Sequence, residues 1–271
     1  MSQPASKAIK DTILIEHLPY ELDGGIARRA SIGLIVLATD YTIEHEWRQL
    51  FAKVDGVALY QSRIYNDNLI TPDSLRAMAP RIVECTRVIT PDTPVDVMAY
   101  GCTSASMAIG EEGVFANIRQ AKPDSKCTTP ITAAFAAFDA FGAKRIGVLT
   151  PYPADVNRIV SEYINARGYE VPVFGSFNAD RDTVVARITP QSIESGVREL
   201  VKHAEVDAIF VSCTSVRLMA ACAELEKNLG IPLTSSNHAM AWHALRLAGI
   251  DDRLGCFGSL YDLPLRQDSS R

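Results

Sequence analysis

Short apolar segments of strand length recur along the chain and alternate with stretches of helical periodicity. The apolar segments are residues 31–37, 54–60, 95–100, 145–149, 170–174, 206–212, 231–234 and 254–257. Helical patterns lie between them at residues 44–54, 73–89, 132–141, 154–167, 189–204, 216–229 and 238–247. Regular alternation of strands and helices is typical of parallel sheets covered by helices, so the pattern predicts the α/β class.

Two landmarks repeat along the chain with one spacing. Thr39-Asp40-Tyr41 resembles Thr150-Pro151-Tyr152, and the segment from Asp96 to Cys102-Thr103-Ser104 resembles the segment from Asp207 to Cys213-Thr214-Ser215. Both pairs are separated by 111 residues (39 to 150, and 102 to 213). Equal offsets favour a duplicated half over chance similarity. The sequence therefore predicts two pseudo-symmetric, Rossmann-like α/β domains with the active site between them.

A fainter repeat relates residues 144–149 to residues 252–257 and indicates that a last strand begins a third copy. Such a strand has no half of its own, so we expect the chain from about residue 240 to rejoin the first domain. The predicted domains are residues 30–135 plus 240–271 and residues 136–239. Residues 1–29 are polar and irregular, which predicts an N-terminal leader.

Composition and charge exclude several classes of function. The chain is 47% hydrophobic and 22% charged, which excludes a mainly disordered protein. Its net charge is -5 and no basic run occurs, so nucleic acid is not an expected partner. The longest apolar stretches, 32–38 and 131–138, are too short to cross a bilayer, and the N-terminus lacks the apolar core of a secretory signal. We expect a cytoplasmic protein without membrane contact.

The six cysteines are dispersed and form no CxxC pair, which predicts free thiols rather than a zinc site or a disulfide framework. The sequence also lacks a GxGxxG fingerprint and a P-loop. We therefore expect no metal, pyridoxal phosphate or nicotinamide cofactor.

Cys102 and Cys213 stand out because each directly follows an apolar strand and precedes Thr and Ser. Ligands bind at the carboxyl ends of parallel strands, where loops and helix N-termini meet. If a helix begins after each cysteine, its N-terminal field should lower the thiol pKa. Either cysteine alone reads most simply as a buried thiol. The matched pair instead predicts one thiol on each side of a small anionic substrate.

Other residues near the strand ends have two possible roles. Asp40, Tyr41 and Tyr152 could line the same cleft or cap helices. Arg63 could clamp a carboxylate or form a structural ion pair. His238 and His243 lie on an apolar helical segment and read as packing histidines.

The motifs together resemble a known group of enzymes. They are Tyr100-Gly-Cys-Thr-Ser, Thr150-Pro-Tyr-Pro-Ala-Asp-Val-Asn157, Val211-Ser-Cys-Thr-Ser and the segment from Thr234 to Gly249. In these motifs the chain is similar to the aspartate/glutamate racemase superfamily. The similarity covers about residues 30–262. It is greatest to the branch of maleate cis-trans isomerase and arylmalonate decarboxylase, which includes proteins associated with ectoine utilisation.

The resemblance implies a cofactor-independent enzyme whose site lies between two α/β halves. In the racemases of this group, one cysteine takes the α-proton and the other returns a proton to the opposite face. In maleate isomerase, the cysteine matching Cys102 adds to the double bond and the one matching Cys213 assists. Tyr152 and Asn178 match residues that bind a substrate carboxylate or enediolate. Thr103, Ser104, Thr214 and Ser215 are the other expected binding residues.

Two departures from the family pattern bear on the reaction. Arylmalonate decarboxylase keeps only the second cysteine, with Gly in the first position, whereas this chain has both. That favours a two-cysteine isomerase or racemase acting on a small carboxylate. Maleate isomerases carry Asn where this chain has Asp40, and Asp suits a substrate with an amino group better than a dianion. The alternatives are an arylmalonate-type decarboxylase and a non-catalytic small-anion binding protein. We expect a homo-oligomer, most simply a dimer, since dimers are the commonest assembly.

Overall fold

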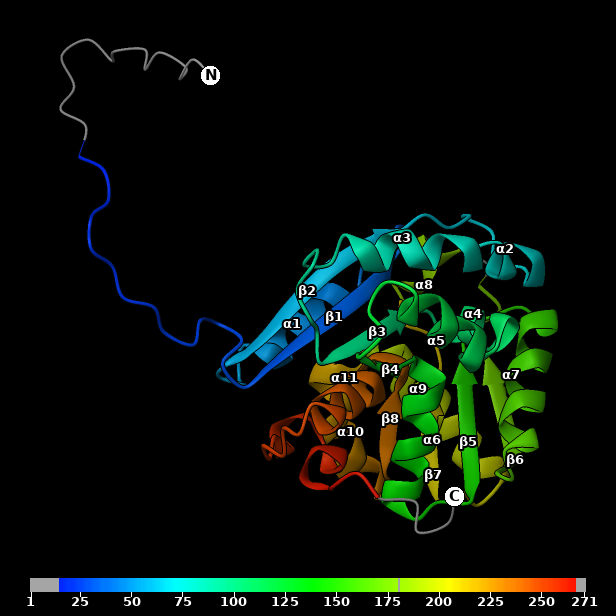
Figure 1. Cartoon of the computed structure of the whole chain (residues 1–271). Helices are drawn as coiled ribbons and strands as arrows, with labels where there is room; N and C mark the ends of the chain where they lie inside the picture. The colour runs from blue at the N-terminus through cyan, green and yellow to red at the C-terminus, as the bar shows by residue number, and fades with distance from the viewer. Residues whose placement is uncertain (1–14, 180, 267–271) are drawn as a thin grey trace.

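Two four-stranded parallel sheets form the framework of the computed structural model, which describes residues 15–179 and 181–266 (Figure 1). The first sheet has the order β2-β1-β3-β4 and the second the order β6-β5-β7-β8. The strands are β1 (Ala30–Leu37), β2 (Val57–Ile64), β3 (Val97–Gly101), β4 (Lys126–Thr128), β5 (Arg145–Thr150), β6 (Glu170–Ser176), β7 (Ala208–Val211) and β8 (Leu233–Ser235). The predicted α/β class with two pseudo-symmetric halves is confirmed.

Helices connect the strands. They are α1 (Ile43–Phe51), α2 (Pro72–Arg76), α3 (Ile82–Arg87), α4 (Thr103–Ile109), α5 (Glu111–Arg119), α6 (Pro130–Phe141), α7 (Ala154–Ala166), α8 (Asp182–Val185), α9 (Pro190–His203), α10 (Cys222–Leu229) and α11 (Ser236–Leu247). Short 3-10 turns are η1 (Ala79–Arg81), η2 (Met219–Ala221), η3 (Gly255–Phe257) and η4 (Ser259–Asp262). The single helix predicted over residues 73–89 is divided at η1. Pro80 lies in that turn and has no N–H to donate within a continuous helix.

The strand pairing shows which of the repeated landmarks correspond. Ile35 pairs with Tyr100 in the first sheet, and Leu149 pairs with Val211 in the second. The offset is 111 residues between β3 and β7 (100 to 211) but 114 between β1 and β5 (35 to 149). Cys102 and Cys213 therefore occupy corresponding positions. The predicted match of Thr39 with Thr150 is wrong by three residues.

Asp96 and Asp207 correspond in structure as well as in sequence. The Asp96 carboxylate accepts a hydrogen bond from the backbone N–H of Ser31 at 2.7 Å, at the start of β1. The Asp207 carboxylate accepts from the N–H groups of Lys144 and Arg145 at 2.8 and 2.7 Å, at the start of β5. In each half, a hydrogen bond thus connects the start of the strand that leads to a cysteine (β3 or β7) with the start of its neighbour (β1 or β5).

The two halves exchange their last helices. α11 follows the second sheet, but Met240, Trp242 and Leu245 pack in one core with Ile32 and Leu34 of β1. α6 follows the first sheet, and its side chains Ile131, Phe135 and Phe138 join the core around β5 and β7. The other face of the first sheet packs against α3 and α5. This exchange agrees with the expected return of residues after about 240 to the first half, while the predicted domain boundaries stay a prediction.

The strand predicted at residues 254–257 is wrong, because Gly255–Phe257 forms the 3-10 turn η3. Gly258 follows it with a φ of 118°, a conformation that favours glycine, and this ends the segment after a single turn. The short strand β4 was not predicted, since its three residues include only one apolar side chain, Cys127. Of the predicted leader, residues 1–14 lie outside the described residues, and the chain from residue 15 extends away from the body until Arg28 and Arg29 contact it (Figure 1).

Candidate active site

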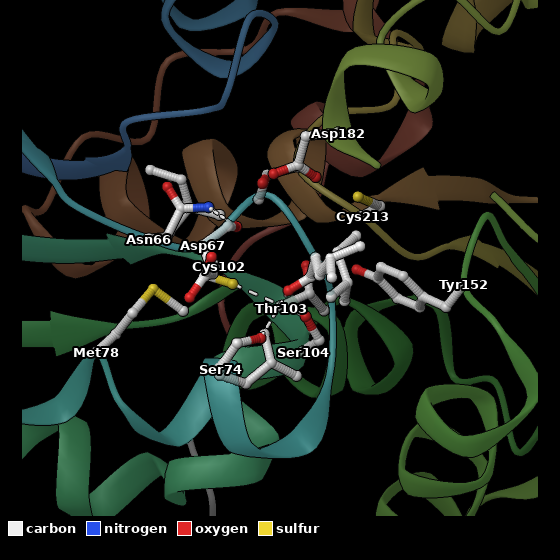
Figure 2. A pocket seen from close by; sticks show the side chains of 15 residues that line it. Asn66, Asp67, Ser74, Met78, Cys102, Thr103, Ser104, Tyr152, Asp182 and Cys213 are labelled. Carbon is white, nitrogen blue, oxygen red and sulfur yellow. Dashed lines mark hydrogen bonds between the residues drawn. The ribbon is translucent and has the colours of Figure 1, made fainter. Parts of the chain in front are cut away.

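A pocket lies between the two halves at the carboxyl ends of β1, β3, β5 and β7 (Figure 2). Its lining comprises Leu37, Asn66, Asp67, Leu69, Ile70, Ser74, Leu75, Met78, Cys102, Thr103, Ser104, Tyr152, Asp182, Cys213 and Thr214. Both cysteines singled out by the repeat are present. The chain folds so that corresponding strand ends of the two sheets converge on one space.

The first thiol lies at the junction of β3 and α4. Cys102 is the N-cap residue of α4, and its carbonyl accepts the Ser106 N–H at 3.1 Å. Its sulfur lies 3.8 Å from the Ser104 hydroxyl. The side chain is only 3% exposed. A helix therefore begins directly after this cysteine, as predicted.

The second thiol has different backbone surroundings. Cys213 follows β7 and is 4% exposed, and a turn rather than a helix comes next, so the predicted helix start there is wrong. The Cys213 N–H donates to the Ser236 hydroxyl at 3.0 Å, and the Thr103 hydroxyl donates to the same oxygen at 2.7 Å. Ser236, at the start of α11, thus links the segments that carry the two thiols.

Both thiols are held in their protonated form. Burial raises the pKa of Cys102 to about 12, and the negative charge of Asp182 adds to the increase. Burial and Asp182 also raise the pKa of Cys213. Hydrogen bonding from the Ala105 N–H favours the Cys102 thiolate but does not offset desolvation. The expectation that a helix N-terminus lowers both pKa values is therefore wrong.

Tyr152 lies across the pocket with its hydroxyl directed toward Cys213 (Figure 2). The nearby hydroxyl favours the Cys213 thiolate, while burial raises the pKa of Tyr152 itself. The backbone carbonyl of Tyr152 accepts hydrogen bonds from Asn157 at 2.7 Å and Ser176 at 2.6 Å. The loop after β5 is thereby fixed, and a phenol donor stays in the pocket.

Three other predicted binding residues, Thr103, Ser104 and Thr214, also line the pocket. The Thr214 hydroxyl donates to the Gly101 carbonyl at 3.4 Å, across the boundary between the halves. Hydroxyl groups from both halves therefore surround the thiols. Of these, the Ser104 hydroxyl can donate to a carboxylate oxygen without adding charge.

Four predicted binding residues are not part of the lining: Asp40, Tyr41, Asn178 and Ser215. Tyr41 is 69% exposed, because it lies three positions out of register with Tyr152. Asn178 is exposed, with a φ of 52°.

Asp40 and Ser215 are buried behind the pocket. Asp40 accepts hydrogen bonds from the Thr42 and Ile43 N–H groups at 2.7 and 2.9 Å, at the start of α1. Burial raises its pKa. Thr214 lies near this carboxylate and favours its charge, but its hydroxyl is directed to Gly101, so Oδ2 of Asp40 has no hydrogen bond.

Asp182 and Asn66 also line the pocket, although they were not among the predicted residues. Asp182 is the first residue of α8, a four-residue helix after β6, and burial raises its pKa. Its only signal in the sequence is its place after a predicted strand end. Asn66 follows β2 in the same way.

The remaining candidates have structural roles. Arg63 pairs with Glu44 at 2.7 Å and donates to the Ala38 and Asp40 carbonyls. His238 and His243 are buried packing histidines, as predicted, and burial lowers the pKa of each to about 4.

In the described part of the chain, no group of three or more His, Cys, Asp or Glu side chains could hold a metal ion. Of the described helices, none is long and apolar enough to cross a membrane.

Comparison with known proteins identifies the group to which this site belongs. The family model for arylmalonate decarboxylase matches residues 32–261, so the chain belongs to the arylmalonate decarboxylase family. It is 26% identical to the maleate isomerase of Alcaligenes faecalis over 195 residues, which cover 68% of this chain and 76% of that protein.

Two solved maleate isomerases have the same fold. The enzyme from Pseudomonas putida S16 with maleate superposes with a TM-score of 0.79 at 24% identity, covering 86% of this chain and 97% of that one. The Nocardia farcinica enzyme with a covalently bound succinylcysteine intermediate gives 0.78 at 22% identity, covering 86% and 98%. The recognised resemblance to the maleate isomerase and arylmalonate decarboxylase branch is confirmed, whereas the association with ectoine utilisation stays a prediction.

Proposed function

We propose that this protein is a cofactor-independent isomerase or racemase of a small carboxylic acid, with Cys102 and Cys213 acting as a pair. The observation that carries the proposal is the presence of both thiols in one pocket, at corresponding strand ends of the two halves. A binding protein does not need this arrangement. Membership in a family of isomerases and decarboxylases supports the same conclusion.

Two chemical routes use such a pair. In a proton-transfer route, one thiolate takes the α-proton while the electron pair moves toward the carboxylate, and the other thiol donates its proton to the opposite face. In an addition route, the Cys102 thiolate bonds to one alkene carbon while the π-electron pair moves to the other carbon and its carboxylate. The remaining single bond rotates, and the returning electron pair re-forms the double bond as the thiolate leaves. The succinylcysteine of the Nocardia enzyme is an example of a covalent intermediate in a relative.

The other lining residues hold the substrate. Ser104 and Tyr152 present hydroxyl groups to a substrate carboxylate, while the hydroxyls of Thr103 and Thr214 hold the segments around the thiols. Asp40 acts indirectly, because it fixes the start of α1. Ser215 also acts indirectly, because it holds Asp182.

Proton NMR in deuterium oxide tests the proposal. The protein is incubated with amino acids, unsaturated diacids and substituted malonates. Deuterium at an α-carbon indicates proton transfer, and a changed alkene coupling indicates isomerisation. Cys102→Ala and Cys213→Ala should each lower turnover by about a thousandfold, with little further loss in the double variant.

Cys222→Ala is the matched control. This thiol is also fully buried, but it donates to the Leu233 carbonyl outside the pocket. The control should keep wild-type turnover. Absence of turnover with every compound contradicts the proposal. Decarboxylation that survives Cys102→Ala but not Cys213→Ala would make a one-cysteine decarboxylase the better conclusion.

A further inference from the structure

The pocket contains a fixed negative charge that the paired-thiol chemistry does not explain. Asp182 is buried on α8 and lines the pocket together with Cys102 and Cys213 (Figure 2). Its charge acts on both sulfurs, since it raises the pKa of each thiol. A carboxylate in this position opposes both thiolate formation and the approach of an anion.

Hydrogen bonds favour the charged form of this carboxylate. The Asn66 side-chain amide donates to the Thr39 hydroxyl oxygen at 2.7 Å, so the Thr39 hydrogen is directed to Oδ2 of Asp182 at 2.5 Å. The Ser215 hydroxyl donates to Oδ1 at 3.2 Å. Both oxygens of Asp182 therefore accept hydrogen bonds. An ionised carboxylate suits this arrangement, since it has only acceptors.

No positive side chain of the lining balances this charge. Of the 15 residues that line the pocket, none is Lys, Arg or His, and the charged ones are Asp67 and Asp182. Asp182 has no ion-pair partner among residues 15–179 and 181–266. A dicarboxylate would place two more negative charges beside it. A molecule with one carboxylate and one ammonium group would bring the missing positive charge.

We propose that Asp182 is the charge-selecting residue of this pocket, which pairs with a cationic group of the substrate and excludes a second carboxylate. The expected substrate class is a zwitterion with an ammonium group beside its carboxylate. This inference rests on the proposed function for the reaction itself. Binding of the ammonium group would also neutralise Asp182 and so remove its opposition to thiolate formation.

The charge of the pocket can be measured without turnover. Two methanethiosulfonate reagents of similar size are compared, the cationic 2-aminoethyl and the anionic 2-sulfonatoethyl compound. Peptide mass spectrometry gives the modification rates at Cys102 and Cys213. The exposed Cys256 in the same chain serves as the reference. The ratio of the cationic to the anionic rate cancels differences in thiol reactivity, because both reagents attack the same thiolate.

In the wild type, this ratio should exceed that of Cys256 by about tenfold, and Asp182→Asn should remove the excess. Asp182→Glu should keep it. Thr39→Ala is the matched control, since it removes a hydrogen bond to Asp182 but keeps the charge, and it should leave the ratio within about twofold. A wild-type ratio equal to that of Cys256 overturns the inference. An equal loss in Thr39→Ala and Asp182→Asn also overturns it, because the carboxylate would then act only as a structural link.

These rates do not depend on catalysis, so the inference and the proposed function can fail separately. A charge-selective pocket with no turnover in the NMR experiment would contradict the function alone. Turnover of a dianion with an unselective pocket would contradict the inference alone.

Discussion

Cys102 and Cys213 lose the hydration of their thiolates on burial, and the charge of Asp182 adds to that cost. The N-terminus of α4 and the Tyr152 hydroxyl offset only a part of it. At the residue scale, the unliganded protein therefore holds two neutral thiols. A reaction through a thiolate then requires that the bound substrate change the local charge.

Thiol reactivity should follow from this state. Because burial raises the pKa of Cys102 to about 12, only a small fraction is thiolate at neutral pH. We expect the rate of Cys102 alkylation by iodoacetamide to rise about tenfold per pH unit from pH 7 to pH 10 without a plateau. Peptide mass spectrometry measures the rate. A plateau near pH 8 would instead indicate a thiol that the helix N-terminus has activated.

The cysteine pair could be predicted from the sequence because a repeated motif marks it and both strand ends keep the same register. Thr103, Ser104 and Thr214 followed as neighbours in the motif. Asp182 could not be found in this way, because the repeated motifs do not extend to the four-residue helix on which it lies. Its importance depends on three-dimensional contacts with Thr39 and Ser215.

At the element scale, α6 packs on both halves at once. Ala133, Ala137 and Ala140 contact the core of the first half, while Phe135 and Phe138 contact that of the second. Small residues on this face let α11 approach closely. The long apolar run at residues 132–141 predicted this helix, because its side chains are apolar on both faces.

The close packing of α6 predicts the effect of a larger side chain. Ala137 is fully buried, so Ala137→Leu should force neighbouring side chains apart and lower the free energy of unfolding by about 1–3 kcal/mol. Ala166→Leu, at the exposed end of α7, should change it by less than about 0.5 kcal/mol. Urea unfolding measures both. Equal stability of the two variants would show that the α6 contact has room to adjust.

Element boundaries were harder to predict than element types. Residues 254–257 have the apolar character of a strand, but Gly255 within the segment and Gly258 after it limit it to one turn. The helix expected at 216–229 begins only at Cys222, after the turn that carries Thr214 and Ser215. That turn contributes to the pocket, which is why it departs from regular periodicity.

At the scale of the whole molecule, buried polar contacts add to the exchanged helices in joining the halves. The Thr42 hydroxyl donates to the Ser215 carbonyl at 2.8 Å, and the Thr214 hydroxyl donates to the Gly101 carbonyl at 3.4 Å. These contacts lie beside the pocket. The relative position of the thiols therefore depends on the integrity of the boundary between the halves.

Glu46 is the ionisable centre of that boundary. Its Oε1 accepts the N–H groups of Leu218 and Met219 at 2.7 and 2.8 Å, and Oε2 accepts the Asn237 amide at 2.8 Å. Burial raises its pKa from 4.5 to about 7 in spite of these hydrogen bonds. Between these two values the folded protein binds more protons at Glu46 than the unfolded chain does, so its ionisation lowers stability as the pH rises.

Replacement of Glu46 by Gln should remove this dependence. Relative to the wild type, Glu46→Gln should gain stability as the pH rises from 5 to 8, by up to roughly 3 kcal/mol. Loss of favourable pairing with Asn237 adds a constant cost that does not vary with pH. His238 and His243 have lowered pKa values and act in the opposite direction, but they do so equally in both proteins.

Urea unfolding at each pH gives the difference in stability between the variant and the wild type. The exposed Glu112→Gln serves as the control and should give a curve parallel to the wild type. If the Glu46→Gln curve is also parallel, Glu46 ionises at the same pH in the folded and unfolded states, and the boundary between the halves is open to water.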